Sequence, residues 1–207
     1  MKRGIYMAAA AVAALSLAAC QKSNEGAENA AAAAGGQTPA VNAAQDTVGA
    51  AVGQVSAATA GANTLQGYVM NAGMGDMYEI EAAKIAQQKG KSADVKSLAK
   101  MIQTDHTAAM NEMKPMVTAA GQTPPANLDQ RRQGMIDNLN AAPADQFDKV
   151  YLTQQVAAHE EALTLHRGYA DNGDNADLKA HAAKVTPKIQ AHLDQAKQLA
   201  QQMGAAN

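Results

Sequence analysis

The feature that most constrains the fold of this chain is a regular spacing of apolar residues along most of its length after residue 64. Apolar residues recur there at alternating steps of three and four, which matches the 3.6-residue turn of an α-helix. Glycines at 90, 121 and 173 interrupt the pattern and indicate helix ends. The pattern predicts long helices that pack through their apolar faces. These helices cover 65–89, 92–120, 144–171 and 175–203.

The composition agrees with a helical domain. The chain has no Trp and one Phe, and it is rich in Ala, Leu, Met and Gln, which favour helices. A shorter pattern at about 128–140 predicts an extra helix between the second and third long helices. We therefore expect residues 64–204 to form an all-α domain, an antiparallel four-helix bundle with one short extra helix in that connection.

The N-terminus resembles a bacterial lipoprotein signal. Two basic residues at 2–3 precede an apolar run, which ends in Leu17-Ala18-Ala19-Cys20. The run is shorter than the roughly 20 residues that span a bilayer, so a cleaved signal peptide at 1–19 is expected. The resemblance implies that Cys20 is lipidated and anchors the protein to a membrane. Gln21 points, by the same resemblance, to the outer membrane, with the domain in the periplasm.

Residues 20–63 are dominated by Ala, Gly, Gln, Asn, Thr and Ser. Such a segment buries too little apolar surface to offset the entropy of ordering, so we expect a flexible tether between the lipid and the domain. Valines near helical spacing leave a marginal helix as the alternative. They are Val41, Val48, Val52 and Val55.

Histidines interrupt the apolar faces of three helices. They are His106, His159 and His192, and the first helix places Asp76 and Glu79 on its apolar face. With a rise of about 1.5 Å per residue, Glu79 and the three histidines fall in neighbouring layers of an up-and-down bundle. His166 and His181 lie nearer to helix ends, and we expect them at the surface.

This arrangement suggests a metal site. The candidate ligands are Glu79, Asp105, His106, His159, Glu160 and His192. Three imidazoles and a carboxylate suit zinc, copper or a single iron ion. The alternative is a buried polar network in which Glu79 pairs with His106 and only sets the helix packing.

The domain also resembles a known family through motifs spread over about 65–200. They are Glu79-Ile80, 95–106 (VKSLAKMIQTDH), 147–151 (FDKVY), His159, Leu178-Lys179, Pro187 and His192-Leu193. Together they look like the bacterial envelope family called domain of unknown function 4142. The resemblance implies a ferritin-like four-helix bundle and brings no established activity. Ferritin-like di-iron proteins carry Glu three residues before His, whereas this chain has Gln103 and Ile189 at those positions.

The sequence narrows the function without fixing it. The absence of a basic cluster argues against a nucleic-acid partner. The single Cys and the lack of a nucleophile motif argue against a hydrolase, so we expect no enzyme, with a metal-dependent redox activity left open. Two interpretations stay in competition. One is a lipid-anchored metal-binding protein, and the other is a structural lipoprotein that binds a protein partner in the envelope.

Overall fold

The described part of the computed structural model is residues 38–204, and helices make up its regular structure. Within this range no strand is found, which confirms the all-α class. The signal peptide and Cys20 lie outside the described residues. No helix in the described range is long and apolar enough to cross a membrane. The elements are α2 (Pro39–Ala57), the 3₁₀ turn η1 (Ala60–Asn63), α3 (Leu65–Lys89), α4 (Ala93–Ala119), α5 (Gln130–Ala141), α6 (Phe147–Asn172) and α7 (Ala176–Gln202).

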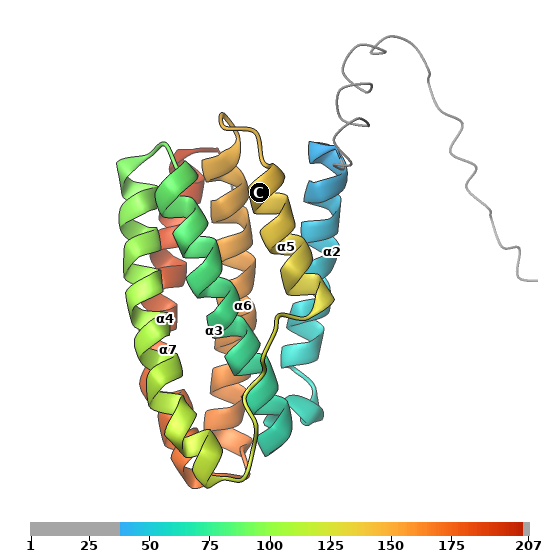
Figure 1. The fold of residues 1–207 in the computed structure, drawn as a ribbon, viewed down its shortest axis with the longest axis vertical. Coiled ribbons are helices and arrows are strands. Elements are labelled where there is room, and N and C mark those ends of the chain that lie inside the picture. The colour runs from blue at the N-terminus through green and yellow to red at the C-terminus, as the bar shows by residue number, and fades with distance from the viewer. Residues whose placement is uncertain (1–37, 205–207) are drawn as a thin grey trace, which may run out of the picture. The chain divides into compact units, whose positions relative to one another are not determined.

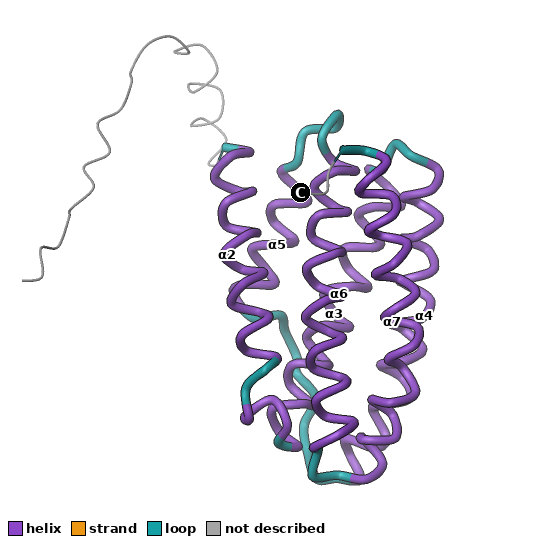
Figure 2. The backbone as a smooth tube through the Cα atoms, turned by 180° about the vertical axis from the view of Figure 1, so that it is seen from behind, coloured by secondary structure: helices purple, strands orange, loops and turns teal. Residues whose placement is uncertain are grey.

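Helices α3, α4, α6 and α7 are the long ones, and they lie side by side along one direction (Figure 1). Short links at 90–92 and 173–175 join α3 to α4 and α6 to α7, so the helices of each pair run antiparallel. The view from behind shows α2 and α5 together on one side, away from α4 and α7 (Figure 2). The expected bounds of the four long helices and of the extra helix α5 agree with the structure to within three residues.

The turn between α3 and α4 is fixed by side chains of two helices. Ser92 caps α4, because its hydroxyl oxygen accepts hydrogen bonds from the backbone amides of Asp94 and Val95. The Asp148 carboxylate of α6 accepts from the amides of Lys91 and Ser92 at 3.0 and 2.8 Å. The α3–α4 pair is thereby attached to the start of α6, which sets the relative height of the three helices.

Prolines lie inside two of the long helices, Pro115 in α4 and Pro187 in α7, and both helices continue past them. Each proline lacks the amide hydrogen that would bond to the carbonyl four residues earlier. One bond is therefore missing from the backbone ladder of each helix.

The core contains two large apolar clusters with a polar layer between them, and a third, smaller cluster of Leu163, Val185, Ile189 and Leu193 beside that layer. One cluster lies toward the α3–α4 turn and includes Leu98, Ile102 and Phe147. The other includes Val69, Val117 and Leu178. Along each long helix the polar layer falls between residues of the two clusters. Its members are Asp76, Glu79, His106, His159 and His192, all buried.

The expected tether is wrong over residues 39–63, because α2 packs against α5 and α6 as part of the domain. Ala57 at the end of α2 joins an apolar cluster, and the rest of the buried side of this helix is polar or glycine. The buried Asp46 carboxylate accepts hydrogen bonds from the side-chain amides of Asn138 at 2.8 Å and Gln154 at 2.7 Å. Gly53 lies against Glu161 so closely that an added Cβ would fall 1.9 Å from a carboxylate oxygen.

The valines that suggested a marginal helix are on its outer face, where Val48 and Val55 are 64% and 68% exposed. The side that packs inward instead presents Asp46, Gly49, Gly53 and Ala57. A hydrophobicity argument therefore misses this helix, because hydrogen bonds and close backbone approach hold it in place.

Candidate functional site

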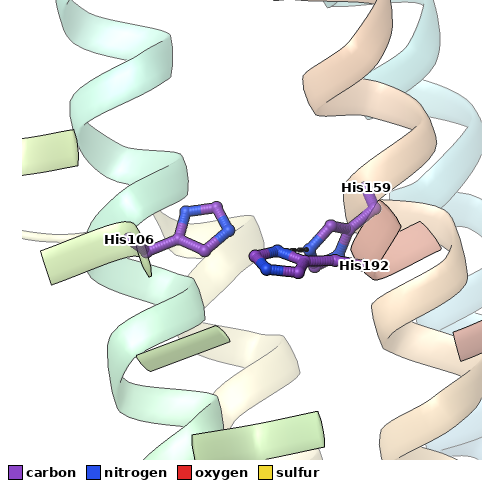
Figure 3. A group of neighbouring side chains, drawn as sticks. All are labelled: His106, His159 and His192. Atoms are coloured by element: carbon purple, nitrogen blue, oxygen red, sulfur yellow. Dashed lines mark hydrogen bonds between the residues drawn. The ribbon is translucent and has the colours of Figure 1, made fainter. Parts of the chain in front are cut away.

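Three histidines from three helices meet inside the domain. His106 comes from α4, His159 from α6 and His192 from α7, and all three are buried. One ring nitrogen of each lies within 4.8 Å of the corresponding nitrogen of the other two. Figure 3 shows the rings turned toward a common space between the helices. The sequence predicted these three side chains in neighbouring layers of the bundle, and the structure brings them together.

The second ring nitrogen of each histidine is hydrogen-bonded to an oxygen atom that can act only as an acceptor. Nδ1 of His106 donates to Asp76 Oδ1 at 2.8 Å, and Nδ1 of His159 donates to the carbonyl oxygen of Gln155 at 2.9 Å. Nε2 of His192 donates to Asp105 Oδ2 at 3.1 Å. Carboxylates and carbonyls have no hydrogen to give, so each of these nitrogens carries the ring proton.

The three remaining nitrogens therefore present lone pairs to one another. Nε2 of His159 and Nδ1 of His192 are 3.4 Å apart, and Nε2 of His106 is buried without a hydrogen-bond partner. Neutral rings in these tautomers cannot bond to each other, because neither facing nitrogen carries a hydrogen. The arrangement calls for a hydrogen-bond donor or a positive centre, namely a water molecule from a bordering cavity, an added proton or a metal ion.

The electrostatic surroundings differ among the three rings. Burial lowers the pKa of His192 to about 4 and holds the pKa of His159 well below its usual value, with the neighbouring His106 acting in the same direction on both. Burial also opposes charging of His106, but the hydrogen bond and charge of Asp76 outweigh it and raise the pKa of His106. At neutral pH, His159 and His192 are therefore neutral and available as ligands.

Glu79 lies beside the cluster. Its Oε1 is 3.5 Å from Nδ1 of His159, and its Oε2 is buried without a partner. Burial raises the pKa of Glu79 to about 7, although the charge of His106 works against this shift. The alternative network had paired Glu79 with His106. That pairing is wrong, because Asp76 of the same helix takes the position beside His106.

The other two carboxylates proposed as ligands have different positions. Asp105 holds His192 from outside the group and also pairs with Lys188. Glu160 is directed away, with a side chain that is 42% exposed and paired with Lys197 at 2.7 Å. The three histidines are thus the group that the described structure brings together, and Glu160 is not part of it.

His166 and His181 are not surface residues, contrary to expectation, since they are 6% and 2% exposed. Nδ1 of His166 lies 3.0 Å from the Tyr68 hydroxyl, and burial lowers the pKa of His166 to about 3. His181 is 3.8 Å from a carboxylate oxygen of Glu112. Each contacts a side chain of another long helix, His166 that of Tyr68 in α3 and His181 that of Glu112 in α4, so both lie between helices.

Small cavities border the cluster on two sides. One of about 30 Å³ is lined by Glu79 and His106 together with residues of α5 and α6. Another of about 20 Å³ is lined by His106 and His192 together with Asp105 and Lys188. Since a water molecule needs about 10–15 Å³ of such volume, each cavity has room for water but for no larger substrate.

These features define an all-helical protein with a cluster of three buried histidines, each fixed by its own hydrogen-bond acceptor. The family model described as domain of unknown function DUF4142 matches residues 50–199, and the chain belongs to this family. Among solved structures, a crystal structure of a DUF305 fragment from Deinococcus radiodurans is similar, with 17% sequence identity and a TM-score of 0.58. The match covers 69% of this chain and 96% of that chain. This likeness concerns the fold alone. No curated protein matches the sequence.

Proposed function

We propose that this protein binds one divalent transition-metal ion, with zinc as the first candidate, through His106, His159 and His192. The observation that carries the proposal is that one ring nitrogen of each histidine lies within 4.8 Å of those of the other two. A tetrahedral zinc ion with Zn–N bonds of about 2.0–2.1 Å places its ligands about 3.4 Å apart. The His159–His192 separation of 3.4 Å already has this value.

The surroundings of the rings support the proposal. Histidine ligands in metal sites usually donate their second nitrogen to a carboxylate or a backbone carbonyl, which fixes the ring and increases its basicity. Asp76, Asp105 and the carbonyl of Gln155 occupy these positions. Water from either small cavity would supply a fourth ligand. A carboxylate-bridged pair of iron ions is less suitable, since Asp76 and Asp105 are each engaged by a histidine.

A second candidate is a buried network that holds a proton in place of a metal ion. The raised pKa of His106 favours it, because a protonated Nε2 would donate to a neighbouring lone pair. Such a network would set the packing of α4, α6 and α7 without binding anything. The two candidates differ in one measurable quantity, the number of metal ions bound per chain.

Metal titration of the purified protein tests the proposal. We expect one Zn²⁺ per chain, and Co²⁺ in its place should give the visible absorption of a tetrahedral complex. His106→Gln, His159→Gln and His192→Gln should each abolish stoichiometric binding. His166→Gln is the matched control, because His166 is equally buried but lies outside the group. Absence of a bound ion, or equal binding by all four variants in a folded state, would favour the proton network.

For the whole protein we propose a lipid-anchored envelope protein with a ferritin-like antiparallel four-helix bundle, placed at the outer membrane with the domain in the periplasm. Support comes from the Leu17-Ala18-Ala19-Cys20 motif and from the antiparallel helix pairs. The test is the membrane fraction of cells that express the full chain. Cys20→Ser should release the protein into the soluble fraction, and unchanged membrane association would contradict the anchor.

A further inference from the structure

Asp105 connects the buried histidines with the surface. Its Oδ2 accepts from Nε2 of His192 at 3.1 Å, and its Oδ1 accepts from Nζ of Lys188 at 2.6 Å. Exposure increases along this chain of contacts, because the side chains of His192, Asp105 and Lys188 are 2%, 25% and 58% exposed. One carboxylate thus contacts both a candidate ligand and a solvent-exposed cation.

The cavity of about 20 Å³ follows the same path. Its lining includes the exposed Lys188 and the buried His106, as well as Asp105 and His192. It therefore borders the surface at one side and two of the three candidate ligands at the other. Asp76 also lines it, so two carboxylates and one lysine face the space through which an ion would pass.

The cavity of about 30 Å³ offers a less favourable route for a cation. It is lined by Arg131 and Arg132, and both guanidinium groups bond to Glu161 at 2.7 Å. A metal ion arriving there would meet two guanidinium groups, and the nearest carboxylate, that of Glu161, is already engaged by both. Displacing them would break a buried ion-pair cluster, which is costly.

We propose that Asp105 is the port through which a divalent cation reaches the histidines, and that Lys188 gates this port by occupying the carboxylate. This inference rests on the proposed metal site. The Lys188 ammonium must leave Oδ1 before a cation can bind there, and its charge repels the arriving ion. The ion then passes from Asp105 to the facing nitrogens of His192 and His106, after which Lys188 returns to its partner.

The experiment compares Lys188→Met with Lys184→Met. Lys184 lies one helical turn earlier in α7, is similarly exposed and pairs with Glu112 at 2.7 Å, but it does not line the cavity. Methionine keeps a flexible stem and removes the charge. The probe is Zn²⁺ alone, mixed rapidly with metal-free protein, and its uptake is followed by competition with a fluorescent zinc indicator. The final stoichiometry is measured in the same samples.

We expect Lys188→Met to load zinc about fivefold faster at low salt, which is the effect of removing one charge about 8 Å from a divalent ion in water. The acceleration should shrink as added salt screens the charge. Lys184→Met should load within twofold of the unmodified protein, and all three proteins should reach one zinc per chain. Equal loading rates for the three proteins, or equal acceleration by both variants, would overturn the port while leaving the metal site intact. No zinc bound at equilibrium by any of the three would refute the metal site itself, and the port with it.

Discussion

Replacing Gly53 by alanine tests how α2 is attached to the domain. Gly53 faces Glu161, and a Cβ atom built on it would lie 1.9 Å from a carboxylate oxygen and 2.9 Å from Nη1 of Arg131. Glu161 cannot move away freely, because its Oε1 accepts hydrogen bonds from both Arg131 and Arg132 at 2.7 Å. The added methyl group must therefore displace either the ion pairs or the helix.

The expected cost follows from two opposing effects. Alanine is favoured over glycine inside a helix by about 1 kcal/mol. Breaking a buried ion pair costs about 3–5 kcal/mol, and the partial exposure of Arg131 and Glu161 reduces this loss. The net result should be a free energy of unfolding lower by about 2 kcal/mol. Without the clash, the same substitution would increase stability.

Urea unfolding followed by circular dichroism measures this change. Gly134→Ala in α5 is the matched control, because a Cβ atom there would meet nothing within 4 Å. This control should be as stable as the unmodified protein or more stable, by up to about 1 kcal/mol. If Gly53→Ala also proved as stable as the unmodified protein, close packing of α2 on Glu161 would be refuted.

Two further predictions concern protons. Burial lowers the pKa of His166 to about 3 and of His192 to about 4, so below about pH 6.5 the unfolded chain binds protons that the folded chain does not. The metal-free protein should lose roughly 1.4 kcal/mol per pH unit for each of these groups between pH 6.5 and 4, as urea midpoints would show. Glu79 acts in the opposite direction over most of this window, because its pKa is raised to about 7 in the folded state, whereas His106 does so only above pH 6.5. Zinc affinity should fall about tenfold per pH unit below the raised pKa of His106, because the ion must displace a proton. Asp76→Asn should move this pH dependence to lower pH, and at higher pH, where His106 is neutral in both proteins, it should weaken zinc binding about 10- to 100-fold. Competition with a chelator measures both effects. An unchanged pH profile would show that Asp76 does not control the pKa of His106.

The long helices and the position of the histidines were predictable because both depend on a local period. Residues such as Ile102 and Ile189 mark the buried face of their helices, and His106 and His192 follow on the same face. Counting the rise from a shared turn then places them at similar heights. The partners of the rings were not predictable in this way. His106 bonds to Asp76 and not to Glu79 because of the directions in which the side chains point, which the sequence does not give. The acceptor for His159 is a backbone carbonyl, which every residue has, so the sequence cannot single it out.

Helix α2 shows the opposite situation, in which a local argument fails. Its sequence is poor in large apolar residues, and the four valines that it has face outward. What positions it is a carboxylate, Asp46, whose partners Asn138 and Gln154 are far away in the sequence. The surface that binds Asp46 exists only once α5 and α6 are packed together. Composition alone therefore predicted a tether, which is wrong for residues 39–63.

Pro187 gives the proposed port a further property. It precedes Lys188 directly and lies five residues before His192, so the hydrogen bond missing from α7 is the one to the carbonyl of Ala183, in the turn that ends at the gate. Opening that turn breaks one bond fewer than opening any neighbouring turn. Amide hydrogens around it should therefore exchange with solvent through local fluctuations rather than through global unfolding. An ion buried as deeply as the three histidines could then exchange on the timescale of a local motion while the rest of the domain stays folded.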